Sequence, residues 1–136
     1  MNNIEDTLDL IKNEFSVFSD PRDKYVYLVD LAKDTKGLAE ENRIEKNRIH
    51  GCTSQAWIIK ELSNKNYIFS TDSDAMIVKG LLSLIERSFN GHTKEDILSV
   101  NGSLFLESIG LGNAISSQRT NGFSNAIHKI QNELLD

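Results

Sequence analysis

The fold is decided by residues 56–70, AWIIKELSNKNYIFS. Two runs of mainly apolar, β-branched and aromatic side chains, residues 56–62 and 67–70, flank the polar segment Ser63-Asn64-Lys65-Asn66. Runs of this composition favour β-strands, and a short polar segment between them is typical of a hairpin turn. Residues 48–50 can supply a third short strand. The stretch therefore predicts a small antiparallel sheet of about three strands.

Helical patterns lie before and after this hairpin, because apolar residues recur there at spacings of three and four. The expected helices cover residues 4–18, 21–36, 74–89 with Ser73 as N-cap, a short segment after Thr93, residues 103–108 and a C-terminal segment containing residues 123–134. The first two should form an antiparallel pair. The third carries two apolar rows, which predicts a central core helix. Residues 38–46 are expected to be a solvated connector whose charges need no partner.

These elements predict an α+β fold in one domain, residues 1–136, with helices packed on one face of the small sheet. A hydrophobic fraction of 39% over 136 residues is enough for one core. Fifteen basic and twenty acidic side chains give a net charge of −5, which argues against a nucleic-acid surface. Acidic residues interrupt the N-terminal segment, and no apolar run approaches the ~18 residues of a membrane span. The expectation is a cytoplasmic protein without nucleic-acid or membrane partners.

Cys52 is the only cysteine of the chain, and it lies directly before the first strand of the hairpin. A lone thiol cannot close an intrachain disulfide or build a structural zinc site, so it is either a small core residue or a group that does covalent chemistry. Gly51 precedes it and polar residues follow it. These neighbours place it in a loop, where a side chain can be presented to a partner, and they favour chemistry.

Three motifs in this order resemble the SufE family of sulfur-acceptor proteins, which work beside a cysteine desulfurase in iron–sulfur cluster biogenesis. The motifs are Asn47-x-Ile49-x-Gly51-Cys52-x-Ser54-Gln55-x-Trp57, Asp72-Ser73-Asp74-Ala75-x-Ile77-Val78-Lys79-Gly80-Leu81 and Ser117-x-Arg119-x-Asn121-Gly122. The resemblance covers the whole chain and implies a SufE/IscU-like fold with the cysteine on a loop. Thr53 and Ala56 depart from the expected pattern, and residues 101–115 match it loosely.

The resemblance implies that Cys52 accepts sulfur as a persulfide from a SufS- or CsdA-like desulfurase, stimulates that enzyme and passes the sulfur to a SufBCD-type scaffold. On this hypothesis the chain is a covalent sulfur carrier and not an enzyme with its own turnover. It needs no cofactor beyond the persulfide and no metal. The SufE-like and CsdE-like branches both stay open, and so do a monomer and a homodimer.

Five further residues are candidates for supporting roles. Gly51 would allow a positive φ and leave room beside the sulfur, although an ordinary turn glycine fits as well. Arg119 is the candidate cation near the thiol, with a solvated arginine as the alternative. Asp74 could hold the Cys52 loop or simply complement a helix dipole. Gln55 could hydrogen-bond within the loop or face water. His50, two residues before the thiol, is disfavoured as its base, because residues two apart in a strand lie roughly 6–7 Å apart.

Two other functions stay open from the residues alone. A non-covalent regulatory partner of a desulfurase or another enzyme would carry Cys52 as incidental packing, and Cys52→Ser would then be silent. A cysteine hydrolase would need a base and an orienting group beside the thiol, and no histidine stands out for that role. Because a persulfide is open to reduction and oxidation, we also expect the resting thiol to retreat against apolar neighbours.

Overall fold

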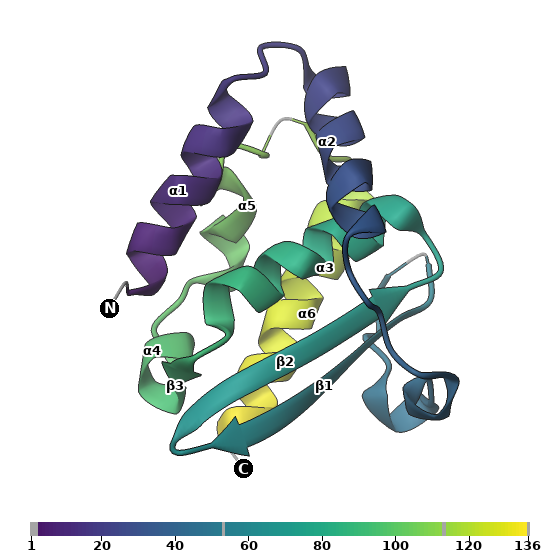
Figure 1. The fold of residues 1–136 in the computed structure, drawn as a ribbon, viewed down its shortest axis with the longest axis vertical. Coiled ribbons are helices and arrows are strands. Elements are labelled where there is room, and N and C mark those ends of the chain that lie inside the picture. Colours follow the sequence, from purple (N-terminus) through teal and green to yellow (C-terminus); the bar gives the residue numbers. More distant parts are fainter. Residues whose placement is uncertain (1–2, 53, 113, 136) are drawn as a thin grey trace.

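The computed structural model describes residues 3–52, 54–112 and 114–135. The sheet contains β1 (Ala56–Ser63), β2 (Asn66–Ser73) and the short β3 (His92–Thr93), in the antiparallel order β1-β2-β3. The helices are α1 (Ile4–Ser16), α2 (Pro21–Lys33), α3 (Met76–Phe89), α4 (Lys94–Leu98), α5 (Phe105–Ser108) and α6 (Ser117–Leu135). Three 3-10 turns are η1 (Glu40–Asn42), η2 (Glu45–Asn47) and η3 (Gly102–Leu104). The predicted α+β architecture is confirmed (Figure 1).

The hairpin is the one that the sequence predicts. Ser63 pairs with Asn66, and the two residues between them, Asn64 and Lys65, have φ values of 50° and 71°. Positive φ at both central residues defines a type I′ turn, whose twist matches that of the flanking strands. β2 continues to Ser73, three residues beyond the predicted end.

The third strand is not the predicted one. Residues 92–93 form it, and they pair with Asn66 and Tyr67 of β2. The segment 48–50 contributes only an isolated bridge between Arg48 and Trp57, at the buried start of β1. A two-residue strand is too short to leave an alternation pattern in the sequence, which is why the prediction missed it.

α3 is the central helix, as its two apolar rows predict. Both rows are buried: Ile77, Val78, Leu81, Leu82, Leu84, Ile85 and Phe89. Gly80 allows α2 to pack closely against α3, because a Cβ atom at this residue would lie 2.1 Å from the carbonyl oxygen of Leu28 in α2. α3 begins at Met76 instead of Asp74, and Ala75 replaces Ser73 at the N-cap position.

α1 and α2 begin at good caps and diverge from their linker (Figure 1). Asn3 caps α1 in a reciprocal capping box with Asp6, and Asp20 caps α2 ahead of Pro21. The two helices are not packed along their whole length. They meet where the ring of Tyr27, midway along α2, lies 5.2 Å from the ring of Phe15 between centroids, and both helices pack on α3.

The C-terminal helix α6 lies behind the hairpin in Figure 1 and closes the core. The predicted stripe of Phe123, Ile127, Ile130 and Leu134 is buried. The connector between α2 and β1 contains η1 and η2, and one of its charges, Arg43, has a partner in the core, the carboxylate of Asp72.

Candidate functional site

Cys52 lies in a tight loop that leads into β1. The loop is closed at its base by the Arg48–Trp57 bridge and by a hydrogen bond in which the amide of Ile49 donates to the carbonyl oxygen of Ala56, 2.8 Å away. Ile49 and Ala56 are both buried, so the base of the loop belongs to the core. Thr53, one of the departures from the family pattern, lies outside the described residues.

The thiol is turned inward and half-buried against the apolar core. It lies in a narrow pocket formed by α3 and α6. The residues that line this pocket are Cys52, Val78, Leu81, Leu82, Gln118, Arg119, Gly122 and Phe123. The sequence-based expectation of a resting thiol packed against apolar neighbours therefore agrees with this geometry.

Gly122 makes the inward position of the thiol possible. A Cβ atom at this residue would lie 2.9 Å from Sγ of Cys52 and 3.4 Å from its Cα, closer than side chains normally approach. Gly122 is in the middle of α6, where glycine weakens a helix by roughly 1 kcal/mol relative to alanine. We conclude that α6 carries a glycine here because the thiol occupies the space of a side chain.

Gly51 is required for two reasons. Its φ is +89°, in the region that favours glycine, and a Cβ atom there would lie 2.0 Å from Nδ2 of Asn125 in α6. The predicted positive φ is present, but the space that the missing side chain leaves is filled by Asn125 and not left open beside the sulfur.

The C-terminal end of the loop, at Gln55, is held by the last residue of β2 and the residue that follows it. The amide of Gln55 donates to the carboxylate of Asp74 at 3.1 Å, and the amide of Asp74 donates to the carbonyl oxygen of Gln55 at 3.1 Å. The hydroxyl of Ser73 donates to the same carbonyl oxygen at 2.7 Å. The structure thus brings Gln55 and Asp74 together, in the arrangement that a loop-holding role for Asp74 requires.

The electrostatics of the site keep the resting thiol protonated. Burial raises the pKa of Cys52 above the ordinary value for a thiol, and the charge of Arg48 opposes this effect without cancelling it. Arg119, the candidate cation from the sequence, lines the same pocket, but its guanidinium carbon lies 5.7 Å from the ring centroid of Tyr25. Arg48 is therefore the cation whose charge acts on the thiol, and the sequence analysis did not single it out.

The position of His50 does not suit a base for the thiol. Its side chain is exposed, and Nε2 lies 3.3 Å from a carboxylate oxygen of Glu45 in η2. This placement agrees with the distance argument against His50 made from the sequence. Among the described ranges, no group of three His, Cys, Asp or Glu side chains is arranged to hold a metal ion.

A buried carboxylate stabilises the connector that precedes the loop. Asp72 is 1% exposed and accepts hydrogen bonds from the amide of Leu38 at 2.8 Å and from Nε of Arg43 at 3.1 Å. Burial alone would raise the pKa of Asp72. The pKa is lowered instead, because the carboxylate accepts these two hydrogen bonds and a third from the amide of Ser73, and because it lies beside the charge of Arg43. The Arg43 guanidinium also lies over Trp57, with Cζ 5.5 Å from the ring centroid. This contradicts the expectation that the charges of residues 38–46 need no partner.

Three residues of the site were missed as contributors by sequence reasoning: Arg48, Gly122 and Asn125. Gly122 belongs to the third motif, and a glycine within a predicted helix is the sequence feature that could have identified it. Arg48 and Asn125 had no such indication. Their roles arise from contacts between segments far apart in the chain.

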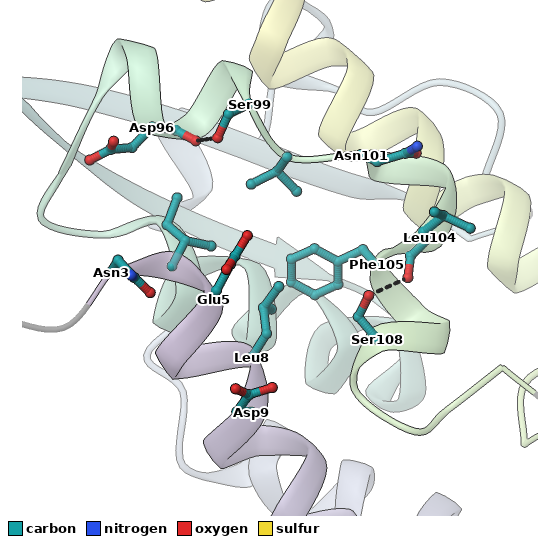
Figure 2. Close-up of a pocket in the computed structure, with 12 residues that line it drawn as sticks. Asn3, Glu5, Leu8, Asp9, Asp96, Ser99, Asn101, Leu104, Phe105 and Ser108 are labelled. Atoms are coloured by element: carbon teal, nitrogen blue, oxygen red, sulfur yellow. Dashed lines mark hydrogen bonds between the residues drawn. The ribbon is translucent and has the colours of Figure 1, made fainter.

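A wider hollow lies away from the thiol pocket. A groove of about 600 Å³ lies between α1 and the segment from α4 to α5, and it shares no lining residue with the thiol pocket. Figure 2 shows Leu8 and Phe105 within it, with Glu5, Asp9 and Asp96 around them. We place the candidate site at Cys52 because the sulfur transfer that the resemblance implies requires a thiol, and none of the residues that line this groove is a cysteine.

Comparison with known proteins identifies the family of this chain. Residues 9–134 match the family model described as SufE, Fe-S metabolism associated domain. An uncharacterised SufE-like protein of Rhizobium etli is 34% identical over 131 residues, covering 93% of this chain and 88% of that protein. A SufE-like protein of Synechocystis is 32% identical over 125 residues, covering 92% and 78%.

The fold has a solved counterpart. The solution structure of a hypothetical protein from Thermus thermophilus superposes with a TM-score of 0.77 at 18% identity, covering 95% of this chain and 93% of the other. At this identity the likeness concerns the fold alone. In the described part of the chain, no helix has the length and apolarity needed to cross a membrane.

Proposed function

This chain belongs to the SufE family, and from that premise we propose that Cys52 accepts sulfur from the persulfide of a cysteine desulfurase. Membership implies a sulfur-acceptor role in iron–sulfur metabolism, as an accessory protein that normally works with a desulfurase. The specific steps proposed here are transfer onto Cys52, stimulation of a SufS- or CsdA-like desulfurase, and delivery to a SufBCD-type scaffold. The observation that carries them is the lone thiol seated against Gly122, with its loop held at both ends.

The transfer is a thiol–disulfide type of exchange and balances without an external oxidant. The thiolate of Cys52 attacks the outer sulfur of the donor's persulfide, a new S–S bond forms on Cys52, and the donor's own S–S bond breaks. The donor cysteine leaves as a thiolate. The proton lost from Cys52 passes to solvent, and a proton from solvent returns to the donor thiolate.

The resting geometry suits a carrier that has to avoid side reactions. The thiolate is the nucleophile, and a pKa above the ordinary thiol value keeps little of it present at neutral pH. Half-burial against α6 also limits the access of small oxidants. We propose that docking on the donor draws the loop outward, where the thiol is hydrated and its pKa returns toward the ordinary value.

The loop is built for a movement confined to its tip. The segments that enter and leave the loop are paired through Arg48, Ile49 and Ala56. Gln55, the last loop residue before β1, is hydrogen-bonded to Asp74. Cys52 lies between these points, and its contact with Gly122 is van der Waals packing. Moving the thiol outward therefore breaks packing against α6 and leaves the bonds at both ends of the loop in place.

The test is intact-protein mass spectrometry of wild type and Cys52→Ser after incubation with cysteine and a candidate desulfurase. We expect a reductant-sensitive mass increase of one sulfur on wild type and none on the variant. If wild type binds the desulfurase and stimulates it without gaining sulfur, and Cys52→Ser behaves identically, the proposal is wrong. The chain is then a non-covalent regulatory partner with an incidental cysteine.

A further inference from the structure

A second, shallow groove lies beside the thiol pocket. It has a volume of about 300 Å³ and is formed by the first turns of α2 and the segment before α6. Its lining residues are Pro21, Arg22, Tyr25, Val26 and Ala114. The ammonium group of Lys24 donates to the carbonyl oxygen of Gly110 at 3.1 Å, which ties α2 to the segment that forms the other wall. The shape of this groove is therefore set by the fold.

Arg119 joins the groove to the thiol pocket. Its side chain lines the thiol pocket, and its guanidinium stacks over Tyr25, which lines the groove. Arg119 has no carboxylate within 4.0 Å among the residues that the structure describes, whereas Arg22 is paired with Asp20 at 2.9 Å. A guanidinium without a carboxylate partner thus lies at the border between the two hollows.

The groove exposes apolar surface that a soluble domain normally covers or uses. Val26 is 57% exposed and Tyr25 is 38% exposed. Tyrosine and arginine are enriched at the energetically important positions of protein interfaces, and an adjacent apolar side chain adds buried area. This combination next to a reactive thiol indicates a docking surface.

We propose that this groove receives a segment of the sulfur donor that combines an apolar side chain with a carboxylate. The carboxylate would accept two hydrogen bonds from Arg119, and the apolar side chain would lie between Tyr25 and Val26. The inference rests on the proposed function, and it identifies where the donor binds and the chemistry that the groove recognises. Continuity with the thiol pocket places the docked segment beside Cys52.

The acidic groove of Figure 2 is the competing surface, and it fits a different partner. Its charged lining residues, Glu5, Asp9 and Asp96, are all acidic and would suit a basic segment. It has no lining residue in common with the thiol pocket, so a donor docked there would not lie against Cys52 through a continuous surface. The two grooves make opposite predictions for the charge of the partner.

Each groove offers an exposed apolar position for a matched pair of variants. Val26→Glu puts a negative charge in the groove beside Arg119, where it would repel the donor's carboxylate. Leu104→Lys puts a positive charge in the acidic groove, where it would repel a basic segment, and Leu104 is 50% exposed. Both side chains are largely in water, so both variants should fold, which thermal unfolding checks. Binding to the desulfurase is measured by titration, and sulfur transfer by mass spectrometry at limiting and at saturating desulfurase.

We expect Val26→Glu to weaken binding at least about tenfold, which corresponds to roughly 1.4 kcal/mol, while Leu104→Lys binds like wild type. Transfer by Val26→Glu should recover at saturating desulfurase, because the thiol chemistry is untouched. Arg119→Gln should reduce the salt dependence of binding, since it removes the charge that meets the donor's carboxylate.

Three results overturn the proposal. The docking surface is wrong if Val26→Glu binds like wild type while wild type still gains sulfur. It is also wrong if Leu104→Lys alone weakens binding, since the donor then uses the acidic groove. If wild type neither binds nor gains sulfur from any desulfurase tested, the proposed function fails, and this inference fails with it.

Discussion

At the scale of single residues, the reactivity of Cys52 is governed by its burial. Burial raises the pKa of the thiol, and the charge of Arg48 only partly opposes this effect. We therefore predict that alkylation of the folded protein by iodoacetamide has a pH midpoint above the ~8.5 of a free cysteine. Alkylation in urea should return to the ordinary midpoint. A folded-state midpoint at or below that of the unfolded chain would contradict this account.

The same shift has a consequence for stability. Because the folded-state pKa lies above the unfolded one, the protonated thiol contributes stability that is fully present below the unfolded pKa. This contribution is lost as pH rises through the folded pKa. Cys52→Ala should therefore reduce the loss of stability at alkaline pH.

Gly122 is the residue that admits the thiol to the core. Gly122→Ala places a Cβ atom 2.9 Å from Sγ, so we predict that the thiol is displaced outward and is alkylated several times faster. Overall stability should change little, because alanine favours the helix by roughly 1 kcal/mol and offsets part of the packing loss. Gly112→Ala is the control, since the nearest atom to its new Cβ would be 3.6 Å away. Unchanged alkylation in Gly122→Ala would show that the thiol does not rest on α6.

At the scale of elements, the Cys52 loop is held by the residues between β2 and α3. Asp74 is exposed, yet its carboxylate accepts from the amide of Gln55 at 3.1 Å. We predict that Asp74→Ala loosens the loop and accelerates alkylation of Cys52, while the free energy of unfolding falls by no more than about 1 kcal/mol. Hydrogen exchange at Gln55 measures the loss of the bond directly.

Asp74→Asn separates the hydrogen bond from the charge. Its side-chain oxygen can accept from the same amide, so alkylation should stay close to that of wild type. If Asp74→Asn behaves like Asp74→Ala, the negative charge and not the hydrogen bond is what holds the loop.

At the scale of the whole molecule, Asp72 links the connector after α2 to the sheet. Its lowered pKa means that its stabilising contribution is present above the unfolded carboxyl pKa and is lost as pH falls through the lower folded value. We predict that Asp72→Asn destabilises the fold by about 2 kcal/mol at neutral pH, because the buried carboxylate loses its charge-assisted hydrogen bonds with the partly exposed Arg43. Urea unfolding at pH 7 and at pH 3 measures the effect, and the difference between variant and wild type should shrink at the lower pH.

Glu133→Gln is the control for the loss of stability predicted for Asp72→Asn. Glu133 is paired with Lys60 and Lys129, but its side chain is 38% exposed, so solvent screens the interaction. Its removal should cost less than about 1 kcal/mol at neutral pH. A loss as large as that for Asp72→Asn would mean that burial does not decide the strength of these pairs.

The sequence by itself determined the local elements and the chemical identity of the site. The hairpin, the two buried rows of α3 and the stripe of α6 follow from composition and periodicity, which act over a few residues. The resemblance of the three motifs led to the family, which the comparisons show. The role of Cys52 stays a prediction, because it depends on a partner.

Only the tertiary structure decided which segments meet. The pairing of residues 92–93 with β2, the seat of Cys52 on Gly122, the position of Asn125 over Gly51 and the burial of Asp72 with Arg43 join residues that are far apart in the chain. No local pattern encodes them, because each results from packing the whole core at once. The charge that acts on the thiol is the clearest case. This charge belongs to Arg48, while Arg119 lies over Tyr25. Because the effect of a charge depends on its distance from the thiol, identifying the residue that carries it requires coordinates.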